Sequence, residues 1–144
     1  AHLLFSYHGI PARYDRREGG LYQQDCQRTT QAVLDALAWP AELATLCYQS
    51  RFGPERWLGP ATAQRLQQLP REGVRTLAVV TPGFLTEGLE TVEEIGRLGR
   101  AQFLGAGGET FVRVPSVAAH PAFLDSLAVR VRSLIGGRPA GQAR

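Results

Sequence analysis

The sequence of 144 residues has no methionine, two cysteines and no long apolar run. Two cysteines are too few for a disulfide scaffold, and an iron–sulfur cluster held by cysteines alone takes four thiolates, so we expect neither. We interpret Cys26 and Cys47 as buried free thiols in a reducing compartment. No segment approaches the roughly 18 apolar residues of a membrane span, and no signal peptide is visible. These absences predict a cytoplasmic protein without a transmembrane segment and leave peripheral membrane association open.

The chain also has only a small net charge. The 16 basic residues are nearly balanced by 13 acidic ones, which gives a formal net charge of +3. The basic residues are spread along the chain, whereas nucleic-acid-binding proteins gather them on one face or helix. We therefore expect no nucleic-acid partner. Because the chain lacks methionine and opens directly on a strand-like run, we expect a processed protein or a piece of a longer one.

Strand-like and helix-like patterns alternate along the chain. They predict strands at 2–7, 42–48, 76–82 and 110–116, and helices at 21–38, 60–69, 90–108 and 121–135. This order predicts an α/β fold, a four-stranded parallel sheet with helices on both faces in a Rossmann-like three-layer sandwich. We expect one domain over 1–135 and a flexible tail over 136–144. No G-x-G-x-x-G or Walker motif is present.

Residues with functional chemistry follow the ends of three predicted strands. The first strand delivers His8, the second delivers Gln49, Ser50 and Arg51 with Trp57 beyond, and the third is followed by Glu87 and Glu90. Ligands of open parallel sheets bind at the carboxyl ends of the strands. We therefore expect these side chains on one edge of the sheet, where an imidazole could accept a proton or bind a metal.

Each of these residues also has a structural interpretation. A histidine at a strand end is as often a packed residue bonded to a turn. Glu87, Glu90 and Glu94 share one helical stripe, where acids in a first turn complement the helix dipole. Glu94 lies a turn deeper, and a nearby cation or proton would relieve the repulsion among the three carboxylates. Trp57 and Tyr22 could fill the core or form a flat apolar wall for a ligand.

Three blocks of the sequence resemble one enzyme family. "FSYHGIP" (5–11), "YQSRFGPERWLGPAT" (48–62) and "TPGFLTEGLETVEEI" (81–95) resemble the carboxyl-terminal half of ferrochelatases, with similarity over about 2–135. Ferrochelatases insert Fe(II) into a porphyrin in haem synthesis, with release of two protons. The resemblance implies a chelatase-like domain, one of two similar domains, with protoporphyrin IX or coproporphyrin III and ferrous iron as substrates. The missing amino-terminal domain is the expected partner.

The resemblance also assigns residues. It implies that His8 and Glu90 form the catalytic pair and handle the metal, and that Glu87 and Glu94 lie on a proton or metal path. It places Tyr22, Ser50, Arg51 and Trp57 at the porphyrin. Two features depart from the family: Gly88 stands where many relatives have His or Cys, and the cysteines that hold a [2Fe-2S] cluster in some relatives are missing. We expect no iron–sulfur cluster, and we expect the isolated chain to be inactive or nearly so.

Two alternatives remain, one within the chelatases and one from a different class of protein. A small homodimeric cobalt or nickel chelatase of a tetrapyrrole pathway has about this length, but such chelatases usually carry a second histidine near the acidic helix. Gly88 and Glu90 argue against that reading. The other alternative is a domain that binds a tetrapyrrole or a metal without catalysis.

Overall fold

The centre of the protein is a four-stranded parallel sheet. The computed structural model describes residues 1–118 and 120–136, and its strands follow the order β2-β1-β3-β4. The strands are β1 (His2–His8), β2 (Ala44–Gln49), β3 (Thr76–Val80) and β4 (Thr110–Arg113). β1 pairs in parallel with β2 and β3, and β3 pairs in parallel with β4. The predicted sheet is confirmed, and its strand ends differ from the predicted ones by up to three residues.

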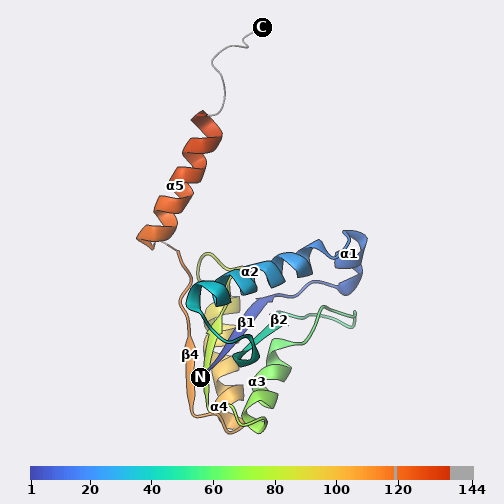
Figure 1. Ribbon diagram of the computed structural model, residues 1–144. Coiled ribbons are helices and arrows are strands. Elements are labelled where there is room, and N and C mark those ends of the chain that lie inside the picture. Colours follow the sequence, from blue (N-terminus) through green and yellow to red (C-terminus); the bar gives the residue numbers. More distant parts are fainter. Residues whose placement is uncertain (119, 137–144) are drawn as a thin grey trace.

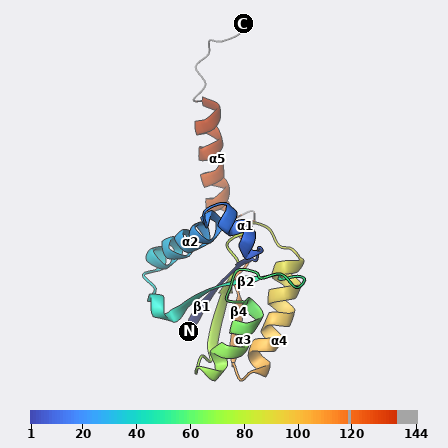
Figure 2. The same ribbon diagram turned by 90° about the vertical axis from the view of Figure 1, so that its right-hand side faces the viewer.

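Helices cover both faces of this sheet. The helical segments of the described residues are α1 (Ala12–Arg17), α2 (Leu21–Leu37), the 3₁₀ turn η1 (Ala41–Leu43), α3 (Thr62–Arg71), the π-helix η2 (Glu90–Gly99), α4 (Arg100–Gly105) and α5 (Pro121–Gly136), of which α5 does not lie on the sheet. Figure 2 shows α2 on one side of the sheet and α3 and α4 on the other. The α/β sandwich expected from the alternating patterns is therefore confirmed.

The central strand β1 is buried on both faces. Its alternating side chains point to opposite sides, so Leu4 joins the apolar layer under α3 and α4, while Phe5 joins the layer under α2. Both side chains are fully buried. The first six residues of β1 are buried, and His8 is the first to emerge into solvent. The burial pattern thus places the histidine at the carboxyl edge of the sheet.

Two helical segments differ from the sequence-based expectation. α1 was not predicted, because its six residues are too few to display a helical period after Pro11. The helix expected over 90–108 divides into the π-helix η2 and the α-helix α4. A single apolar stripe fits both helix types over such a short length, so the pattern could not separate them.

The last helix does not pack on the sheet. α5 extends away from the sheet and its covering helices (Figures 1 and 2), and none of its residues is buried. Four apolar side chains share one stripe of this helix, and all four are exposed: Leu124, Leu127, Val131 and Leu134. An apolar stripe shows that a helix can bury one face and does not identify the covering surface. Gly136 ends α5, and 137–144 of the expected tail lie outside the described residues.

Within 1–118 and 120–136, no helix combines the length and the hydropathy that crossing a bilayer requires.

Gly108 provides a test of core packing. A Cβ at this position would lie 2.1–2.6 Å from three atoms of the fully buried Phe103 ring. That ring packs on Phe111 with their centroids 6.0 Å apart, so it cannot easily move. We expect Gly108→Ala to lower the free energy of unfolding in urea by about 1–3 kcal/mol. Gly105→Ala is the control, because a Cβ there meets no atom within 4 Å, and equal losses in the two variants would contradict this packing.

Candidate functional site

His8 presents one ring nitrogen to the rim of the sheet. Its Nδ1 lies 2.7 Å from the carbonyl oxygen of Gly9. A carbonyl oxygen can only accept a hydrogen bond, so Nδ1 must be the donor and Nε2 carries the lone pair of the neutral ring. Nε2 has no hydrogen-bond partner among the residues that the structure describes. The turn therefore fixes His8 in the tautomer of a base whose acceptor nitrogen is available.

Two aromatic side chains lie around the backbone of this turn. The hydroxyl of Tyr22, from the first turn of α2, donates to the carbonyl oxygen of His8 at 2.6 Å. Trp57 lies beside Gly9, where an added Cβ would come within 3.2 Å of the indole and 2.7 Å of the Gln49 carbonyl oxygen. Only glycine fits here, so Gly9 allows the indole and β2 to approach the turn after β1 closely. Tyr22 and Trp57 thus both lie at the turn that follows His8.

Trp57 is held by backbone pairing rather than by its indole nitrogen. The amides of Ala12 and Leu58 donate to the carbonyl oxygens of Arg56 and Ile10, at 2.9 and 3.0 Å. The chain around Trp57 therefore runs beside the turn after β1. The indole Nε1 is buried and has no partner within the described part of the chain. Arg51 also lies near this turn, with its Cγ 3.6 Å from where a Gly9 Cβ would be, and its side chain is exposed.

Gln49 connects the strand of His8 to the helix of Glu90. It pairs with His8 across β1 and β2, and its side chain is 2% exposed. Its Oε1 accepts a hydrogen bond from Ser6 Oγ at 2.7 Å, and its Nε2 donates to the carbonyl oxygen of Glu90 at 2.7 Å. His8 and Glu90 are therefore attached to the same rim through one buried amide.

The carboxylate of Glu90 has a different environment from the other acids of this segment. It has no hydrogen-bond or ion-pair partner among 1–118 and 120–136. A Cβ at Gly88 would lie 3.1 Å from Glu90 Oε2, so a larger residue at 88 would contact this carboxylate. Glycine at that position, the departure from the family noted in the sequence, leaves space for the Glu90 side chain.

Glu94 is held at the end of β2. Its carboxylate accepts hydrogen bonds from the Ser50 amide at 2.7 Å, from Ser50 Oγ at 2.6 Å and from Gln49 Nε2 at 3.4 Å. Ser50 has a φ of 58°, a left-handed conformation that is uncommon for residues other than glycine. The structure thus brings Ser50 and Glu94 together, with the Ser50 hydroxyl turned toward the carboxylate.

Glu87 is held at the end of β4. Its carboxylate accepts two hydrogen bonds from Arg113 Nη1 at 2.7 and 2.9 Å, one from Thr91 Oγ1 at 2.6 Å and one from the Ser116 amide at 3.0 Å. These interactions, chiefly those from Arg113, lower the pKa of Glu87 from 4.5 to about 2. Glu87 therefore faces the β4 side of the sheet as a fixed anion.

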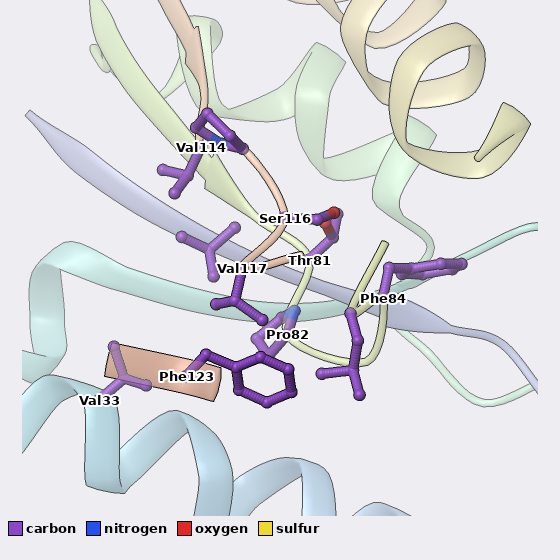
Figure 3. Close-up of a pocket in the computed structure, with 11 residues that line it drawn as sticks. Val33, Thr81, Pro82, Phe84, Val114, Ser116, Val117 and Phe123 are labelled. Carbon is purple, nitrogen blue, oxygen red and sulfur yellow. The ribbon is translucent and has the colours of Figure 1, made fainter. Parts of the chain in front are cut away.

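An apolar pocket of about 290 Å³ adjoins the site through Phe84. Figure 3 shows it between α2, the segments that leave β3 and β4, and Phe123 of α5. The Phe84 ring also lies 6.2 Å from the His8 ring, measured between centroids. The lining contains no His, Cys, Asp or Glu, so this pocket offers apolar contact rather than metal ligands.

The described residues do not assemble a metal centre by themselves. Within 1–118 and 120–136, no group of three or more His, Cys, Asp or Glu is arranged to hold a metal ion. A metal ion bound by His8 or Glu90 would therefore need further ligands from a molecule bound at this site or from another polypeptide.

Three residues that contribute to this arrangement had no role assigned to them from the sequence. Gln49 was expected on this edge, because it follows the second predicted strand. Phe84 followed the third strand in the same way. Arg113 gave no signal, because it lies 26 residues from Glu87 in the sequence and only the parallel pairing of β3 with β4 brings β4 to this edge.

The low pKa of Glu87 predicts a specific acid dependence. A carboxyl group with a lowered folded-state pKa stabilises the folded chain above its ordinary pKa of 4.5, and this contribution is lost as the pH falls toward about 2. We expect Glu87→Gln to lower Tm near neutral pH, with the difference from the unmutated chain narrowing between about pH 4.5 and 2. Glu42→Gln, at an exposed position, is the control. A difference independent of pH would contradict the role of the ionised carboxylate.

Comparison with known proteins finds relatives of this chain in one enzyme family. A family model described as Ferrochelatase matches residues 1–134. The chain is 46% identical to the coproporphyrin III ferrochelatase of Streptococcus mutans over 88% of its own length and 40% of that protein. It is 43% identical to a ferrochelatase of Actinobacillus pleuropneumoniae, over 92% of this chain and 41% of that one. The chain thus spans about 40% of the length of these relatives.

A solved structure of a different protein has the same fold. The putative cobalamin biosynthesis protein CbiX from Marinobacter aquaeolei aligns with a TM-score of 0.62 and 14% identity, over 95% of this chain and 98% of that one. At this identity the likeness establishes the chelatase-like fold and nothing further. The family model, in contrast, covers nearly the whole sequence, and on that ground the chain belongs to the ferrochelatase family.

Proposed function

We propose that this chain supplies the carboxyl-terminal half of an active site that inserts Fe(II) into protoporphyrin IX or coproporphyrin III. The observation that carries the proposal is the His8–Glu90 pair: an imidazole fixed as a base and a carboxylate without a partner in the described chain, joined through Gln49. Membership of the ferrochelatase family supports this reaction. The relatives are more than twice as long as the chain, and this supports a partner domain that supplies the rest of the cleft.

The geometry fits the proton balance of the reaction. A porphyrin releases two N–H protons when a divalent metal enters, and both protons must reach an acceptor. His8 Nε2 is oriented to accept a pyrrole proton, while Nδ1–H remains bonded to Gly9 and stabilises the imidazolium that forms. The Glu90 carboxylate can attract Fe(II) or take the second proton. In this proposal Trp57 and Tyr22 contact the flat macrocycle, and Ser50 and Arg51 lie at its edge.

A chimera tests the role of His8. Residues 1–134 would replace the matching segment of the Streptococcus mutans relative, and Fe(II) insertion would be followed by loss of porphyrin fluorescence. We expect His8→Ala to lower kcat at least about 100-fold, because general-base catalysis contributes 10²–10⁴. His120→Ala replaces another exposed histidine and should retain full activity. Insertion by the His8→Ala chimera within twofold of the parent would overturn the assignment.

The same chimera tests Glu90. We expect Glu90→Gln to lower kcat by a similar factor, since the amide keeps the size of the side chain but loses the charge and the proton acceptor. Glu93→Gln is the matched control, because the Glu93 carboxylate is paired with Arg97 on the solvent side of the same helix. Equal activity of the Glu90→Gln and Glu93→Gln chimeras would exclude Glu90 from the chemistry.

We expect the isolated chain not to catalyse metal insertion. A half-site whose described residues assemble no metal centre lacks ligands and the opposing wall that insertion requires. We expect the 144-residue chain, assayed with Fe(II), Co(II) or Ni(II) and either porphyrin, to show no insertion above the uncatalysed rate.

Enzymatic turnover by a tight homodimer, with its size measured by light scattering, would instead support a small homodimeric chelatase. Tight porphyrin binding by a chimera without insertion would indicate a non-catalytic tetrapyrrole-binding domain.

A further inference from the structure

The helix that carries Glu90 depends on side chains from neighbouring strands. η2 extends from Glu90 to Gly99 as a π-helix, and its N-cap Leu89 makes no side-chain capping hydrogen bond. π-helices are rare and mostly limited to single turns, since their geometry is less favourable than that of an α-helix. A ten-residue π-helix therefore needs interactions from outside the helix to hold its first turns in place.

One such interaction comes from the β4 side. Arg113, at the end of β4, donates two hydrogen bonds to Glu87, and the Ser116 amide donates a third. The buried Thr91 donates to the same carboxylate and accepts from the Gly88 amide at 2.9 Å. The segment immediately before Glu90 and the residue immediately after it are thus both tied to the exit of β4.

A second interaction comes from the β2 side, one turn further along η2. Glu94 accepts hydrogen bonds from the amide and the hydroxyl of Ser50, and from Gln49, which also holds the carbonyl oxygen of Glu90. Ser50 is in a left-handed conformation, and both of its hydrogen bonds to Glu94 require it to stay there. Glu94 therefore joins η2 to the exit of β2.

Both carboxylates are occupied by these bonds. A group that relays protons must gain and lose them, and a group that carries a metal must offer free oxygen lone pairs. Glu87 accepts four hydrogen bonds and is neutralised by Arg113, while Glu94 accepts three. This arrangement favours a fixed structural anion at each position over the proton or metal path expected from the family resemblance.

We propose that Glu87 and Glu94 are positioning residues, which fix η2 to the exits of β4 and β2 and so hold Glu90 on the rim beside His8. The proposal rests on the proposed function for what Glu90 does there. Small displacements of a catalytic group reduce turnover strongly, and about 1 Å can cost 100-fold. Loss of either interaction should therefore lower kcat although neither side chain touches the reacting atoms.

Arg113 does not titrate in the working pH range, so its removal distinguishes a positioning role of Glu87 from a proton-relay role. In the chimera we expect Glu87→Gln and Arg113→Gln each to lower kcat by about 10- to 100-fold per folded molecule. The double variant should be no worse than either single one, because both remove the same interaction. Glu94→Gln should have a similar effect, and all these variants should keep the shape of the kcat–pH profile. Glu93→Gln, which removes an arginine-paired carboxylate not tied to another element, is the matched control and should leave kcat unchanged.

Two kinetic outcomes would overturn the proposal. If Glu87→Gln lowers kcat and removes one limb of the pH profile while Arg113→Gln leaves kcat unchanged, Glu87 relays protons. If every variant keeps kcat per folded molecule, the interactions have a structural role alone.

Amide hydrogen exchange of the 144-residue chain provides a test that does not depend on catalysis. We expect Glu87→Gln and Glu94→Gln to speed exchange of the amides around 90–95 at least about tenfold, and Glu93→Gln to leave it unchanged. Unchanged exchange in the first two variants would overturn the proposal even if the chimera inserts iron. Faster exchange with an inactive chimera would support the anchoring while rejecting the proposed function.

Discussion

The side chain of Gln49 is the contact on which the candidate site depends. This buried amide accepts from Ser6 in β1 and donates to the Glu90 carbonyl oxygen in η2, and it lies at the end of β2. Removing it would leave the Glu90 carbonyl oxygen and the Ser6 hydroxyl without this partner in a region with little water. The strand that ends in His8 and the helix that begins with Glu90 keep a fixed relative position, because the Gln49 amide is hydrogen-bonded to both.

Much of the sheet could be predicted from the sequence, because continuous apolar runs indicate strands that are buried on both faces. β1 and β3 were predicted on that basis, and the parallel arrangement followed from the intervening helices. The pattern failed where the outcome depends on a partner surface. The π-helical form of η2 depends on bonds from two other strands, and the position of α5 depends on what covers its apolar stripe. The spacing of apolar residues along the sequence determines neither property.

The composition of the site could be predicted, while its internal connections could not. Parallel strands bring their carboxyl ends to one edge, so His8, Gln49, Ser50 and Glu90 were expected together, while the hydrogen bond from Gln49 to Glu90 was not. The tautomer of His8 required the distance from Nδ1 to the Gly9 carbonyl oxygen. The partner of Glu87 required the position of Arg113. The roles assigned to Tyr22, Arg51 and Trp57 remain predictions, since contacts with a macrocycle would have to test them.

The acidic stripe illustrates how a fold makes identical side chains chemically different. The sequence places four glutamates within two helical turns: Glu87, Glu90, Glu93 and Glu94. Arginines balance the first and the third, and the Ser50 and Gln49 donors satisfy the last. Protein partners therefore relieve most of the repulsion that a nearby cation or proton would relieve. Of these four, Glu90 is the one whose carboxylate has no partner among the described residues, and its backbone carbonyl oxygen is bonded to Gln49 at the strand end beside His8.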